Sequence, residues 1–197
     1  MNGRSWTLGG LEFRMLMEHA GRDRLPFPIQ FQPTADSAAD YHRQRHEAAE
    51  SVARMMDDDL RLAIHTLVTP NVRVEVVGHR SSSPISTEKI RGHAARGHEI
   101  AVVATQQPAD TDRSGGAVTL SLLEPFRAVA AVLKVLPPAD GGTAPRMDVD
   151  YAGASVETQS PLVRRAGRRT DEDRYEALFS RAPTCAGEIL VCTGSAT

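Results

Sequence analysis

The sequence predicts an α+β fold around a central antiparallel β-sheet of about four or five strands flanked by helices. Four strand patterns follow one another between Val72 and Leu123, and the connections between them are too short for crossover helices. Apolar residues recur at helical spacing before and after this region. The short connections indicate an antiparallel meander and exclude a parallel βαβ arrangement.

The N-terminal region predicts a helix followed by a proline-containing strand. The helix is expected over Leu8–Ala20, with Gly9 as its N-cap and Glu12 in the capping-box position. The segment Phe27–Phe31 alternates apolar and other residues, but its prolines lack a backbone N–H group. This segment is therefore expected at a sheet edge or a strand start.

Two further helices are expected before the sheet. One covers Thr34–Met56, and the next begins at the acidic run Asp57–Asp59 and stops before Pro70. Carboxylates at a helix start are favoured by the helix dipole. Consecutive acids on a helix also point in different directions, so the run is not expected to hold a metal ion.

The first two strand patterns are expected to form half-buried strands joined by a loop. Residues 71–78 alternate valine with charged side chains, and residues 88–97 place Ile90 and Ala94 on the apolar side. The charged residues of this second pattern and His93 are then expected on the polar side. The loop between the two strands is expected over His79–Thr87.

The next two patterns complete the meander. Residues 98–107 are apolar on both faces at their centre, which predicts an inner strand containing Ile100, Val102 and Val103. A tight turn at Gly97 precedes this strand. Residues 117–124 then alternate again, which predicts one further strand.

The C-terminal third has weaker patterns. A helix is expected over Glu124–Leu136, with Phe126, Val129, Ala130 and Leu133 on its buried face. Residues 139–169 are rich in Gly, Pro and polar residues and are expected to be a linker or poorly ordered. A capping box at Thr170 predicts a short helix, and residues 187–194 predict a last strand. The expected organisation is therefore residues 1–138, 139–169 and 170–197.

Composition excludes several classes of function. The formal net charge is -2, and no run of residues is apolar enough for a membrane span. Neither nucleic-acid binding nor membrane insertion is expected. The N-terminus lacks a secretory signal pattern, so the expected location is the cytoplasm. Only two of the 23 basic residues are lysine, which is typical of a GC-rich, for example actinobacterial, genome.

Motifs for chemistry are largely absent from the sequence. It has no phosphate-binding glycine loop and no nucleophile elbow, and Cys185 and Cys192 are too far apart on one strand for a disulfide. His42 and His46 have metal-ligand spacing but lie among charged residues typical of a solvated helix face. No catalytic residue, cofactor or metal is expected, and a binding protein is favoured over an enzyme.

Two other functions remain open on the residues alone. One is a small-molecule-binding α+β domain, which would contain a closed apolar pocket with a few convergent polar groups. The other is an enzyme with a dispersed active site, in which His42, His65 and His93 would be the candidate bases.

The order of several segments resembles the EspG family, the specificity chaperones of ESX (type VII) secretion. The segments are WTLGGLEFRMLMEHAG and LPFPIQ near the N-terminus, DLRLAIHTLVTPNVRVEVVG, the strand series from Glu88 to Leu122, and TDEDRYEALFSRAPTCAGEILVCTG. The resemblance implies an antiparallel sheet flanked by helical bundles. It also implies a non-catalytic cytoplasmic protein that binds PE–PPE heterodimers and keeps them soluble until secretion.

The resemblance also implies a partner-binding site. In the family, a loop between two early strands helps to grip the tip of the PPE partner. The matching residues here are Arg80, Ser81, Ser82, Ser83, Pro84, Ile85, Ser86 and Thr87. The alternative is an ordinary hairpin connection.

The C-terminus is expected to differ from the family. Members continue beyond the strand that matches residues 187–193, whereas this sequence ends at Thr197. The second half of the fold is therefore expected to be incomplete. The strand Ile189–Cys192 then needs another partner, for which Phe27–Phe31 is one candidate.

Overall fold

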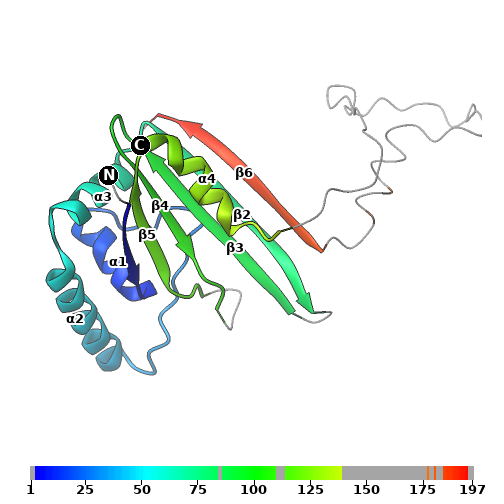
Figure 1. The fold of residues 1–197 in the computed structure, drawn as a ribbon. Helices are drawn as coiled ribbons and strands as arrows, with labels where there is room; N and C mark the ends of the chain where they lie inside the picture. The colour runs from blue at the N-terminus through cyan, green and yellow to red at the C-terminus, as the bar shows by residue number, and fades with distance from the viewer. Residues whose placement is uncertain are drawn as a thin grey trace, which may run out of the picture. The chain divides into compact units, whose positions relative to one another are not determined.

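The computed structural model describes residues 3–83, 86–109, 114–138, 177, 180 and 184–194. Within them lies a six-stranded antiparallel sheet of order β1-β5-β4-β3-β2-β6 (Figure 1). The strands are β1 (Arg4–Leu8), β2 (Val72–Ser83), β3 (Ser86–Arg96), β4 (Ala101–Gln106), β5 (Val118–Leu123) and β6 (Cys185–Thr193). The predicted α+β class and antiparallel sheet are confirmed.

The strand that the sequence prediction missed is β1. It adds to β5 at one edge of the sheet, with Trp6 opposite Leu120. Only Trp6 and Leu8 of this five-residue strand are buried, so its alternating pattern is short. The described sheet therefore has six strands and not four or five.

Different helices pack against the two faces of the sheet. Helices α1 (Gly10–His19), α2 (Ala38–Met55) and α3 (Asp58–Val68) lie on one side, called here the three-helix face, and α4 (Ala128–Val132) lies on the other, the α4 face (Figure 1). In β4, Val102 packs with the three helices, whereas Val103 packs with α4. The prediction that this strand is apolar on both faces and lies inside the sheet is confirmed, although Ile100, expected in the strand, lies just before it.

Hydrogen bonds from capping residues fix where α1, α2 and α3 begin, and the sequence predicted the starts of α1 and α3. The Gly9 N–H donates to Glu12 Oε2 at 2.7 Å, and the Leu60 N–H donates to Asp57 Oδ1 at 2.9 Å. The helix expected from Thr34 begins instead at Ala38, where Ser37 Oγ accepts the Asp40 N–H at 3.1 Å. These bonds satisfy backbone donors that have no partner inside a helix.

A cluster of charges joins α1 to α2. Glu18 accepts hydrogen bonds from Arg45 at 2.8 Å and from Arg14 at 3.0 Å. The Arg45 guanidinium is the main cause of a lowered pKa at Glu18. Because these groups are partly exposed, the cluster orients the two helices more than it stabilises them.

The expected edge strand Phe27–Phe31 is not a strand. It lies instead against the end of β4, where Gln106 Oε1 accepts the Gln30 N–H at 3.0 Å and Gln106 Nε2 donates to the Gln30 carbonyl at 2.6 Å. One buried side chain thus makes both backbone hydrogen bonds that a neighbouring strand would have made. Prolines on either side of Phe27 prevent a regular ladder.

The helix expected over Glu124–Leu136 is broken, and its predicted buried face is wrong. Short 3₁₀ turns, Pro125–Arg127 and Leu133–Val135, flank the five-residue α4. Ala128 and Val132 are buried, whereas Phe126 is 81% exposed. A 3₁₀ turn advances each residue further around the axis than an α-turn does, so the faces inferred from α-helical spacing are displaced.

The last strand is present and pairs with β2. The register places Ile189 opposite Val76 and Gly187 opposite Gly78. Phe27–Phe31 is not its partner. At Gly78 a β-carbon would lie 2.7 Å from the Ala186 carbonyl oxygen, so the glycine permits the close approach of the two strands.

The chain divides into two compact units, Met1–Pro137 with Cys185–Thr197, and Pro138–Thr184. All six strands belong to the first unit. In the second, only Pro138, Ala177, Ser180 and Thr184 are described. The linker expected over residues 139–169 and the helix opened by Thr170 lie outside the described residues, and the three-part organisation stays a prediction.

Candidate partner-binding site

The segment expected to be a loop, His79–Thr87, is largely an extension of the β2–β3 hairpin. Arg80 pairs with Glu88, Ser81 with Thr87 and Ser83 with Ser86. Pro84 and Ile85 lie outside the described residues. The loop prediction is therefore corrected, because backbone pairing between β2 and β3 continues into the serines, with a shift of register between Ser81 and Ser83.

The end of the hairpin extends past its neighbours in the sheet. On one side, β4 pairs only with Arg91–Arg96 of β3. On the other, β6 pairs only as far as Arg80 of β2. Beyond these limits and among the described strands, Ser81 and Ser83 of β2 pair only with β3, and Ser86–Ile90 of β3 pair only with β2. At roughly 3.3 Å per residue, five residues of β3 extend about 16 Å beyond β4.

An ion pair crosses the hairpin where the extension begins. Arg80 Nη2 lies 2.6 Å from Glu88 Oε2, and Arg80 Nε donates to the same oxygen at 2.7 Å. Both side chains are partly exposed, so the pair contributes little free energy. As a directly opposed cross-strand pair it favours the observed register.

The described residues of the predicted site lie at this hairpin end. Arg80, Ser81 and Thr87 are exposed, and the backbones of Ser82, Ser83 and Ser86 lie in the two strands. Strand pairing fixes the backbone at these described positions. A cavity of about 260 Å³ adjoins it, lined by Phe27, Pro28, Gln30, Val77, Gly78, His79, Lys89, Ile90 and Arg91.

The residues next to the hairpin end include two that sequence analysis placed on the polar side. Arg91 and His93 are both buried. Arg91 donates to Gln30 Oε1 at 3.0 Å, and His93 Nδ1 lies 2.7 Å from the Phe27 carbonyl oxygen. The residues around Phe27 fold over this face of β3 and cover both side chains, which a pattern within β3 alone does not reveal.

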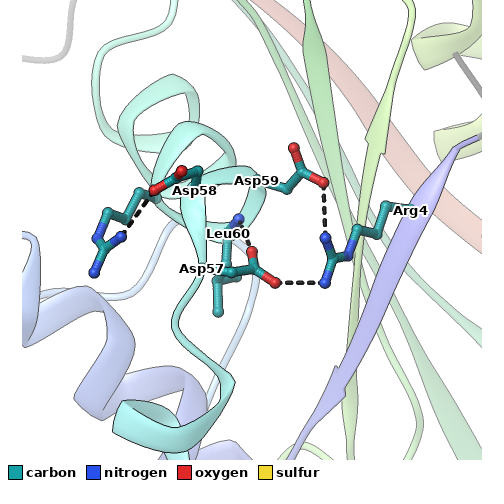
Figure 2. Close-up of polar contacts among 6 residues, drawn as sticks. Arg4, Asp57, Asp58, Asp59 and Leu60 are labelled. Atoms are coloured by element: carbon teal, nitrogen blue, oxygen red, sulfur yellow. Dashed lines mark hydrogen bonds and ion pairs between the residues drawn. The ribbon is translucent and has the colours of Figure 1, made fainter.

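The acidic run at the start of α3 is an ion-pair site. Arg4 of β1 pairs with Asp57 and, at 2.8 Å, with Asp59, whereas Asp58 pairs with Arg61 (Figure 2). The described residues contain no cluster of potential ligands that could hold a metal ion. The run joins the edge strand to α3, and its place at the start of a helix agrees with the prediction.

The three candidate bases are not brought together. His42 is exposed on α2 and His65 is exposed on α3, whereas His93 is buried in β3. His65 Nε2 contacts Thr69 on its own helix. Among the described residues this separation leaves no histidine constellation for catalysis.

Several large apolar side chains are exposed, among them Phe27 and Leu62 of α3. Phe126 and Val129 project from the region of α4, and Ile189, Leu190 and Val191 from β6. The two cysteines are free thiols on β6, as predicted. No helix in the described part of the chain is long and apolar enough to cross a membrane.

Comparison with known proteins identifies a family for this chain. The sequence model of the EspG family matches residues 10–197. A search of the curated proteins returned no match. The matched region includes five of the six strands and all four α-helices of the described structure. A match over nearly the whole length establishes the relationship, and the chain belongs to the EspG family.

Proposed function

We propose that this protein is a cytoplasmic, non-catalytic chaperone that binds PE–PPE heterodimers for ESX secretion. The observation that carries the proposal is the EspG family match over residues 10–197, because this is a family of ESX secretion-associated chaperones. The chaperone would bind an exposed apolar helical tip of the substrate that otherwise aggregates.

The hairpin end supports a role in gripping such a partner. It presents Arg80, Ser81 and Thr87 on a two-stranded extension that is held together by backbone pairing. A surface that is ordered before binding loses less conformational entropy when a partner docks. The adjoining cavity offers space beside it for an apolar side chain of the partner.

Co-expression with a PE–PPE pair tests the function. A pair encoded beside this gene is expected to be soluble and to co-purify with the chain, because the chaperone covers its aggregation-prone tip. A matched expression without the chaperone is the control. If the pair remains insoluble and does not co-purify, the proposed function is wrong.

A charge exchange tests the hairpin end specifically. The double variant Arg80→Glu/Glu88→Arg keeps an opposite-charge pair across the hairpin but reverses the charges presented to a partner. We expect weaker PE–PPE binding with an unchanged midpoint of thermal unfolding. The double variant Arg43→Glu/Glu47→Arg, an exposed pair on α2, is the matched control and should bind normally. Equal affinity of both variants would remove the hairpin end from the site.

A further inference from the structure

A second cavity, of about 480 Å³, lies on the three-helix face away from the hairpin end. Its lining is Met17, Arg22, Asp23, Arg24, Leu25, Pro26, Phe27, Leu67, Val68, Pro70, Arg73, Glu75 and His93. We call it the His93 pocket. Its volume lies within the range of pockets that bind small organic groups, about 300–1,000 Å³.

The wall of the His93 pocket contains one unsatisfied polar atom. His93 is 3% exposed, and its Nδ1 is 2.7 Å from the Phe27 carbonyl oxygen. A carbonyl only accepts, so Nδ1 carries the proton in this contact. His93 Nε2 is buried and has no hydrogen-bond partner among the described residues.

The charge state of His93 decides what this atom can bind. Burial lowers the pKa of His93, so the ring is neutral at neutral pH. With the proton on Nδ1, Nε2 is an acceptor. A buried acceptor without a partner is costly, and a ligand that donates an O–H or N–H group would remove this cost.

The lining includes the charged residues Arg22, Asp23, Arg24, Arg73 and Glu75, and its apolar part can pack against an aromatic ring that carries the donor. Met17 and Leu67 are buried and apolar, and Phe27 is the exposed large apolar side chain of the lining. Thioether and aromatic side chains both pack favourably on aromatic rings. At the same pocket, Arg73 Nε donates to Glu75 Oε1 at 2.9 Å, so this guanidinium is held beside the space where a ring would lie.

We propose that the His93 pocket binds an aromatic group carrying a hydrogen-bond donor, with His93 Nε2 as the acceptor. This site goes beyond the proposed chaperone function and does not depend on it. The group has two possible sources, a free phenol or indole, or a tyrosine or tryptophan side chain of a bound polypeptide. Because Nε2 is buried, the ligand must displace part of the wall to reach it.

The test compares ligands that differ only in the donor. The full chain is titrated with p-cresol and with toluene, and binding is followed by NMR. We expect p-cresol to bind about fivefold more tightly, the factor of one neutral hydrogen bond. We also expect p-cresol, but not toluene, to shift the His93 ring nitrogen resonance. Equal affinities with no such shift, or no binding of either compound, would overturn the proposal and leave a buried water as the partner of Nε2.

Variants and a second pair of probes complete the design. In His93→Phe the preference for p-cresol over toluene should disappear, whereas His46→Phe, at an exposed position of α2, should keep it. If His93→Phe does not fold, the nitrogen shift in the unmodified chain still decides the question. Tighter binding of N-acetyltyrosinamide than of p-cresol, with N-acetylphenylalaninamide weaker, would assign the site to a polypeptide side chain. The reverse order would assign it to a free phenol. No PE–PPE pair is needed, so this result is separable from failure of the chaperone function.

Discussion

At the residue scale, the His93 imidazole makes the stability of the fold depend on pH. Burial is the main cause of its lowered pKa, and the proximity of Arg73 lowers it further. The hydrogen bond to the Phe27 carbonyl and the charge of Glu75 oppose this effect without cancelling it. The folded protein therefore takes up a proton at His93 only at a lower pH than the unfolded chain does.

The sign of the effect on unfolding follows from this difference. Above the ordinary histidine value of 6.5 neither state binds the proton, and stability is unaffected. Below it the unfolded state binds more protons, so the free energy of unfolding falls as pH falls towards the lower folded pKa. We expect urea midpoints to decrease between about pH 7 and pH 5.

Substitution isolates the contribution of His93. His93→Gln removes the titration and should flatten this part of the pH profile, whereas His46→Gln on exposed α2 should not. The lowered pKa of Glu18 acts separately, because its stabilisation is lost only below its ordinary value of 4.5. An unchanged slope in His93→Gln would show that another group causes the acid dependence.

At the element scale, the start of α3 depends on Asp57 more than on its acidic neighbours. Asp57 both accepts the Leu60 N–H and pairs with Arg4 of β1, whereas Asp58 is almost fully exposed and pairs only with Arg61 (Figure 2). We expect Asp57→Ala to lower the free energy of unfolding by about 1 kcal/mol, measured by urea denaturation. The matched variant Asp58→Ala should change it little.

A third variant separates the two roles of Asp57. Asn is an equally good N-cap but carries no charge. Asp57→Asn should therefore recover most of the stability lost in Asp57→Ala. If Asn and Ala are equally destabilising, the ion pair with Arg4, and not the cap, holds this helix start.

At the scale of the whole molecule, hydrogen exchange can measure how completely β6 is paired within the sheet. It pairs with β2 over nine positions, and no strand pairs with its outer edge among the described residues. In an antiparallel pair, alternate N–H groups point towards and away from the partner. We expect alternate amides of β6 to resist hydrogen exchange, whereas the amides of β4, paired on both sides, should all be protected. Uniform protection along β6 would mean that its outer edge is also covered.

The sequence was sufficient where a pattern is local. Patterns of residues a few positions apart predict where α1 and α3 begin, at Gly10 and Asp58. They also predict the strands β2 to β5 and the inner position of β4. The order of these segments also indicated the family before any fold was known. The candidate hairpin was located in the sequence, although its residues belong to strands for most of their length.

The tertiary structure decided three features. These are the burial of His93 and Arg91, the hydrogen bonds between Gln106 and the Gln30 backbone, and the pairing of β1 with β5. Gln30 and Gln106 are 76 positions apart, and Trp6 meets Leu120 from opposite ends of the first unit. No periodicity within one strand shows which distant segment will cover it. The sequence by itself therefore determined α1 to α3 and the strands β2 to β6 in their order along the chain, because propensity, capping and alternation act over a few residues. Burial, and with it the His93 pocket, was determined only when the chain packed against itself, because desolvation depends on neighbours that are distant in sequence.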